Sequence, residues 1–65
     1  MMKTMKMIWN DGDQCYFTFL GMKLYGVVNE KNERLTREYG EPWYWVYETT
    51  AGTRYPVSYK DIEAR

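Results

Sequence analysis

Alternating apolar and polar residues predict β-strands over most of the chain. The clearest alternation spans residues 14–20, where Cys15, Phe17 and Phe19 occupy every second position and are expected to point inward. Tyr16 falls on the opposite, outward face of that strand. Further strands are predicted at 4–9, 22–29, 43–49 and 53–57.

The strongest strand signal is the run Trp43-Tyr44-Trp45-Val46-Tyr47, because all five residue types favour extended backbone. A polar run that ends at Gly52 follows it, and the strand at 53–57 then completes a hairpin. The pattern leaves open which face of the first strand points inward. The two alternatives are Tyr44, Val46 and Glu48, or Trp43, Trp45 and Tyr47.

Residues 29–42 allow two interpretations. In the favoured one, Asn32 is the N-cap of a short helix over 33–39, and Gly40 lies just past its end. Pro42 would then prevent the helix from continuing. In the other, a turn is followed by an irregular extended arm, because seven residues are too few for a helix that does not pack against the rest of the protein.

Glycines mark two further features. Asn10-Asp11-Gly12-Asp13 is a strong turn signal, which either closes a hairpin or leads the chain into the next strand. Gly26 lies inside the strand predicted at 22–29. A glycine in that position is more typical of a bulge or a bend than of a functional site.

Two stretches resemble a known group of folds. From Asp13 to Val28 an acidic turn precedes alternating apolar residues, a glycine and Gly-Val-Val, and from Gly52 to Ile62 the chain carries Tyr55, Val57 and Asp61-Ile62. Together these resemble the small SH3-like barrels, which include KOW and Tudor-type domains and several short phage and prophage proteins. The resemblance covers roughly residues 12–63 and implies a final 3₁₀ turn at 58–62, whose Ile62 plugs the barrel.

The chain departs from this group by about a dozen residues inserted before the Trp43 strand. We therefore predict one all-β domain over residues 1–65. It would be a small five-stranded SH3-like barrel with a helical or loop insertion around 32–40 and a 3₁₀ turn near the C-terminus. The predicted core residues are Phe17, Phe19, Val28, Val46, Tyr55, Val57 and Ile62.

Composition limits how such a domain is stabilised. A chain of 65 residues buries only about 60% of the surface that its unfolded form exposes. Its single cysteine excludes an intrachain disulfide. The domain must therefore be stabilised by dense packing of its aromatic residues, which make up 18% of the chain, or by self-association. The absence of disulfide pairs predicts a cytoplasmic protein. Residues 1–9 are too short and too interrupted for a signal peptide or a membrane span.

The sequence offers little for catalysis. It has no histidine, and therefore lacks the commonest general base and metal ligand. Cys15 is better explained as a buried structural thiol than as a nucleophile. The acidic residues Asp11, Asp13 and Glu41 are better explained as solvated turn residues than as ligands of a hard cation. We therefore expect no enzyme, no cofactor and no metal.

The surplus of aromatic residues is the main functional signal. A small barrel hides only one face of the Trp43 strand, so several rings should lie outside, where they either cover neighbouring loops or form a recognition surface. We expect a protein partner and no membrane contact. The resemblance to short phage and prophage proteins implies an accessory or host-modulating protein that acts by contact with that partner. The candidate surface comprises Tyr16, Trp43, Tyr44, Trp45, Tyr47 and Arg54.

Two further expectations follow from composition. Zero net charge argues against a protein that mainly binds phosphate backbones. A nucleic-acid-binding barrel is nevertheless the main alternative, with bases stacked on exposed rings beside Lys3, Lys6, Lys23, Arg34, Arg37 and Arg54. A weak homodimer is also expected, because the chain is small, uncharged overall and rich in rings.

Overall fold

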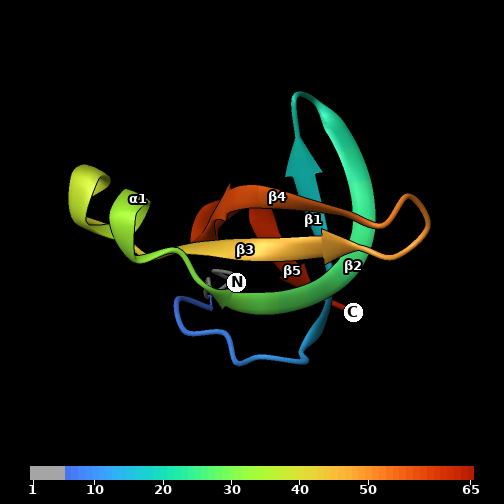
Figure 1. Ribbon diagram of the computed structural model, residues 1–65, viewed down its shortest axis with the longest axis horizontal. Helices are drawn as coiled ribbons and strands as arrows, with labels where there is room; N and C mark the ends of the chain where they lie inside the picture. The colour runs from blue at the N-terminus through green and yellow to red at the C-terminus, as the bar shows by residue number, and fades with distance from the viewer. Residues whose placement is uncertain (1–5) are drawn as a thin grey trace, which may run out of the picture.

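The computed structural model describes residues 6–65, which form one antiparallel sheet of five strands with the order β4-β3-β2-β1-β5 (Figure 1). A short helix and a 3₁₀ turn complete the domain. This arrangement confirms the predicted fold class. The elements are β1 (Gln14–Phe19), β2 (Met22–Lys31), α1 (Glu33–Tyr39), β3 (Trp43–Glu48), β4 (Thr53–Ser58), the 3₁₀ turn η1 (Tyr59–Asp61) and β5 (Ile62–Ala64).

The sheet curls until strands that are not neighbours meet. β2 bends strongly along its length, and β1 and β4 flank the β2–β3 pair (Figure 1). The ring of Tyr55 on β4 lies with its centroid 5.7 Å from that of Phe17 and 4.7 Å from that of Phe19, both on β1. These contacts enclose the apolar interior, as expected for tightly twisted sheets in small domains.

The interior is built from side chains of the inward face of every strand. Phe17, Val28, Val46, Val57 and Ile62 are buried as predicted. Phe19 and Tyr55 are half-buried and pack against that cluster. The remaining buried apolar residues are Trp9, Cys15 and Tyr44.

β3 resolves the alternative that the sequence left open. Its inward residues are Tyr44, Val46 and Glu48, whereas Trp43 and Trp45 are half-buried on the other side. Glu48 tolerates burial because its Oε1 accepts a hydrogen bond from the backbone N–H of Ala51, at 2.6 Å, inside the β3–β4 turn.

The predicted first strand is wrong for the residues that can be judged. Positions 4 and 5 lie outside the described residues, and 6–9 are not a strand. The physical reason is Trp9, whose side chain enters the core while its backbone N–H donates to the Tyr44 hydroxyl instead of to a neighbouring strand. The turn at 10–13 then leads the chain into β1. The fifth strand is β5, which follows η1 and pairs with β1.

A bulge or a bend was expected at Gly26, and the bulge does not lie at this residue. The register of β2 and β3 shifts between Val28 and Glu30 instead. A Cβ atom on Gly26 would collide with the backbone carbonyl oxygen of Tyr47 and crowd the ring of Phe17. The glycine therefore allows β2 to approach β3 closely where the sheet curls.

The structure confirms the helical interpretation of residues 32–40. The Asn32 side chain accepts a hydrogen bond from Leu35 N at 3.1 Å, and Gly40 takes a left-handed conformation with φ of 69°. Gly40 N in turn donates to Thr36 O, at 3.0 Å. α1 lies at one end of the sheet, next to the start of β3 (Figure 1).

Candidate binding site

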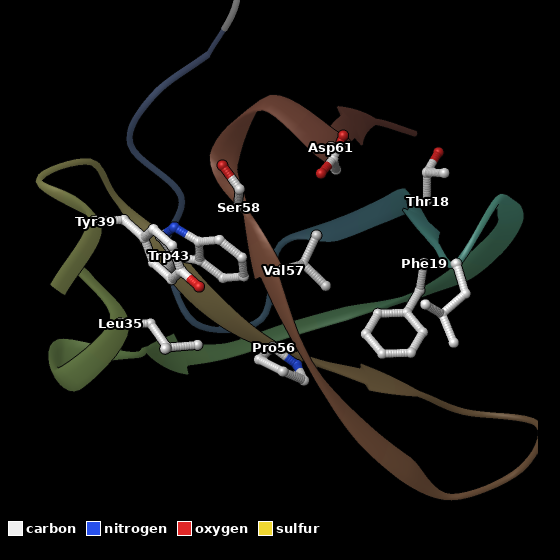
Figure 2. A pocket seen from close by; sticks show the side chains of 10 residues that line it. Thr18, Phe19, Leu35, Tyr39, Trp43, Pro56, Val57, Ser58 and Asp61 are labelled. Atoms are coloured by element: carbon white, nitrogen blue, oxygen red, sulfur yellow. The ribbon is translucent and has the colours of Figure 1, made fainter.

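A groove of about 340 Å³ lies between α1, β4 and the β1–β2 turn (Figure 2). We call it the α1 groove. Its walls are mainly apolar, and its polar groups lie where β1, β4 and η1 meet. It is lined by Thr18, Phe19, Leu20, Leu35, Tyr39, Trp43, Pro56, Val57, Ser58 and Asp61.

The β1–β2 turn places an apolar side chain on the rim of this groove. Leu20 and Gly21 form a two-residue hairpin loop with φ of 50° and 79°, as a type I′ turn requires. Asn, Asp and Gly are the usual residues there, because a larger side chain is strained at positive φ. Leu20 is also 85% exposed, so packing within the domain does not explain why an apolar side chain occupies this turn position. Strain of this kind is typical of binding sites.

The opposite wall is a pair of stacked rings. Tyr39 of α1 lies against Trp43 of β3 with ring centroids 5.0 Å apart and an angle of 22° between the ring planes. Thr36 joins the two elements, because its Oγ1 accepts a hydrogen bond from Trp43 N at 2.9 Å and donates to Trp43 O at 3.3 Å. Figure 2 shows the two rings together at one end of the groove.

The groove has one charged lining residue, Asp61 on η1. The nearby carboxylate of Glu41 accepts a hydrogen bond from Ser58 Oγ at 2.9 Å and pairs with Lys60 Nζ at 3.3 Å. The Asp61 carboxylate has no comparable partner among residues 6–65. It therefore gives the groove a negative character.

A second group of aromatic residues lies on the outer face of the sheet. Cations cover three of its rings: Lys23 lies over Tyr16 at 5.3 Å, and Arg65 over Tyr25 at 4.2 Å. Arg54 lies over Trp45, also at 4.2 Å. Such contacts contribute about 0.5–1 kcal/mol each at exposed sites. We call this surface the outer face; it comprises Tyr16, Lys23, Tyr25, Trp45, Tyr47, Arg54 and Arg65.

The candidate residues from the sequence therefore separate into three places. Trp43 lines the α1 groove. The outer face holds Tyr16, Trp45, Tyr47 and Arg54. Tyr44 does not belong to an exposed surface, because it is only 3% exposed and its hydroxyl is bonded to the backbone of the segment before β1.

Several groove residues were missed from the sequence. Leu20 had a detectable signal, since Leu-Gly between two strands places an apolar residue in a tight turn. The apolar pair Leu35 and Tyr39, four residues apart on the expected helix, also indicated a face that needs a partner. Asp61 gave no signal of its own.

Catalytic groups do not gather in the described part of the chain. Burial, and to a lesser extent the charge of Asp13, raises the pKa of the Cys15 thiol from 9.0 to about 11, so the thiol stays protonated at neutral pH. No three carboxylate, cysteine or histidine side chains within residues 6–65 come together where they could hold a metal ion. Over the same residues, no helix is long and apolar enough to cross a membrane.

Comparison of the chain with protein-family models, with curated proteins and with solved structures found no match. The fold itself is that of a small, mostly antiparallel β domain with one helix. The resemblance to SH3-like barrels stays a prediction.

Proposed function

We propose that this protein is a non-enzymatic binding module that takes an apolar segment of another protein into the α1 groove. The observation that carries the proposal is Leu20, an exposed leucine held at positive φ on the rim of an apolar groove. Leucine is strained at this turn position and exposes apolar surface to water. Contact with a partner would explain why it is found there.

The charge of the groove favours protein over nucleic acid as the occupant. Asp61 is its one charged lining residue, and a carboxylate repels the phosphates of a nucleic acid. The apolar walls suit the side chains of an extended protein segment. The resemblance to short phage and prophage proteins supports a role as an accessory or host-modulating factor that acts by stoichiometric contact.

Selection from a displayed library of random peptides tests this proposal. The best peptide is synthesised, and its affinity is measured by calorimetry for the wild type, Leu20→Glu and Met22→Glu. Both positions are exposed apolar residues of the same hairpin, but only Leu20 lines the groove. We expect Leu20→Glu to weaken binding about tenfold or more. Met22→Glu should leave the affinity within about twofold, since an exposed residue that does not contact the bound peptide contributes little to binding. Equal effects of the two variants, or no selected binder, would reject the proposal.

The outer face supports a second candidate function, binding of single-stranded nucleic acid. Its rings offer stacking platforms, each worth about 1–3 kcal/mol per base. Against it, two of its cations are already paired with carboxylates: Lys23 with Glu63 at 3.5 Å, and Arg54 with Glu30 at 3.4 Å. An oligonucleotide titration at low and high salt tests this candidate function, because binding to phosphates weakens steeply as salt rises.

A weak homodimer through the outer face also stays a proposal. Tyr47 is 39% exposed there, and α1 packs against Trp43 rather than over Tyr47. Sedimentation over a hundredfold concentration range would show a shift toward twice the chain mass, and Tyr47→Glu should abolish it. A constant monomer mass would exclude this dimer.

A further inference from the structure

Two buried side-chain nitrogens near the junction of α1 and β3 have no hydrogen-bond partner. They are Asn32 Nδ2 and Trp43 Nε1, and within residues 6–65 no other buried side-chain nitrogen or oxygen is left unpaired. Burying a donor without an acceptor is unfavourable, so native structures rarely keep such groups without a reason. Both lie at the junction that holds α1 against β3, and each could still donate to an acceptor.

α1 is only lightly attached to the rest of the domain. It has seven residues, none of them buried, and a helix of this length is not stable by itself. Its attachments are the Asn32 cap, the hydrogen bond from Asn32 N–H to Trp43 O at 2.8 Å, the two Thr36 hydrogen bonds to Trp43, the half-buried Leu35 and the Tyr39–Trp43 stack. Segments with so few buried contacts open locally at low free energy.

Tyr39 is the part of α1 that covers Trp43. Its ring stacks on the indole, yet Tyr39 remains 60% exposed. In Figure 2 the indole nitrogen lies at the Tyr39 end of the groove, away from Val57. If Tyr39 moves off, one face of the indole and its N–H become open to whatever occupies the groove.

We infer that α1 is a lid over a hidden subsite of the α1 groove, which opens when Tyr39 leaves Trp43. This inference rests on the proposed function. The occupant is an extended segment of a partner protein: an apolar side chain takes the place of the Tyr39 ring on the indole, and a main-chain carbonyl accepts a hydrogen bond from Trp43 Nε1. A neutral carbonyl fits better than an anionic acceptor, because the Asp61 carboxylate lines the same groove.

The lid can be tested first without any ligand. Exchange of the indole N–H protons with solvent is followed by NMR, with Trp9 as an internal reference, because Trp9 Nε1 donates to Lys6 O at 3.1 Å. In the wild type, Trp43 Nε1–H should exchange by local opening, which depends on denaturant less than exchange at Trp9 does. Tyr39→Ala should raise the ratio of the Trp43 rate to the Trp9 rate about tenfold, whereas Arg34→Ala, an exposed change on the same helix, should leave that ratio unchanged. If Tyr39→Ala leaves this ratio unchanged, the lid is wrong. Global unfolding cannot produce the expected result, because it raises the exchange rates of both indole protons and so does not raise their ratio.

The ligand side of the inference uses the peptide selected against the wild type. If Tyr39 is a lid that the peptide displaces, Tyr39→Ala binds the peptide several-fold more tightly, because the opening is no longer opposed. If Tyr39 is a fixed wall of the groove, the same variant binds more weakly, and the lid is overturned. Replacing Trp43 with an isostere that carries sulfur in place of the N–H should weaken binding about three- to tenfold, while leaving the free protein no less stable. Unchanged affinity for the isostere overturns the proposed hydrogen bond.

Different results would reject the proposed function and the lid. If no peptide binds, the proposed function fails, whatever the exchange rates show. If a peptide binds and Leu20→Glu weakens it, but the exchange ratio does not respond to Tyr39→Ala, the proposed function stands and the lid is wrong.

Discussion

The Tyr44 hydroxyl accepts a hydrogen bond from the backbone N–H of Trp9 at 3.2 Å. The same hydroxyl donates to the carbonyl of Met7 at 2.9 Å, so one side chain of β3 fixes the segment that precedes β1. The indole of Trp9 is thereby held in the core, where it is only 5% exposed.

Tyr44→Phe should therefore destabilise the domain without changing its apolar packing. The change leaves two backbone groups near Trp9 without their partner, and we expect a loss of about 1–3 kcal/mol. Urea unfolding measures it, with Tyr16→Phe as the control, because that ring is exposed. Equal midpoints for both variants would show that the Tyr44 hydroxyl does not stabilise the fold.

Gly26→Ala should be among the most damaging single methyl additions in this chain. The new Cβ would meet the carbonyl oxygen of Tyr47, which belongs to the backbone and cannot move aside like a side chain. We expect a loss of about 3 kcal/mol or more, at the upper end of the range for overpacked sites. Asn29→Ala, at the exposed bulge of the same strand, serves as the control in thermal unfolding. A native-like melting temperature for Gly26→Ala would contradict the close approach of β2 and β3.

The sequence predicted those features that depend on local pattern. Alternation located β1 to β4, and Asn32 with Gly40 located the helix. Strand faces and helix caps can be predicted because they depend on residues that are close together in the sequence. The fate of Trp9 could not be predicted in this way. Its burial depends on Tyr44, which is 35 residues away along the chain.

The same distinction applies to the candidate site. Sequence reasoning found Trp43 as a surplus ring but grouped it with Tyr44 and Trp45, because alternation alone does not say which face of a strand points inward. The groove itself joins Leu20, Tyr39 and Asp61, which come from three separate elements. Only the curl of the sheet brings them together.

Leu20→Asn should stabilise the free protein while weakening binding. Asn tolerates the positive φ of this turn position better than Leu does, and we expect a gain of up to about 1 kcal/mol. The same change removes the apolar rim of the α1 groove, so affinity for a selected peptide should fall. Thermal unfolding and calorimetry of one preparation measure both quantities. A variant that is more stable and binds as well as the wild type would mean that Leu20 has no role in binding.

Cys15 should make the stability of the domain fall at high pH. Its folded pKa of about 11 lies above the ordinary value of 9.0, because burial disfavours the thiolate. The unfolded chain therefore releases this proton first. The contribution is complete below pH 9 and is lost as the pH rises toward 11.

The size of that loss is roughly 2–3 kcal/mol for a shift of this magnitude. Urea unfolding between neutral pH and pH 11 measures it. Cys15→Ala is the control, since the two proteins differ only at this residue and only the wild type can lose the thiol proton. Parallel pH profiles for the two proteins would contradict the assigned shift.

The central claim, that the α1 groove is where a partner protein binds, is tested most directly by mapping a bound peptide onto the structure. The backbone amides of the isotope-labelled protein are followed by NMR while the selected peptide is added. We expect the largest shift changes at Thr18 to Leu20, at the α1 residues Leu35 and Tyr39, and at Trp43, with little change at Tyr16 and Tyr47. Changes concentrated at Tyr16, Tyr25, Tyr47 and Arg54, with an unperturbed groove, would contradict it.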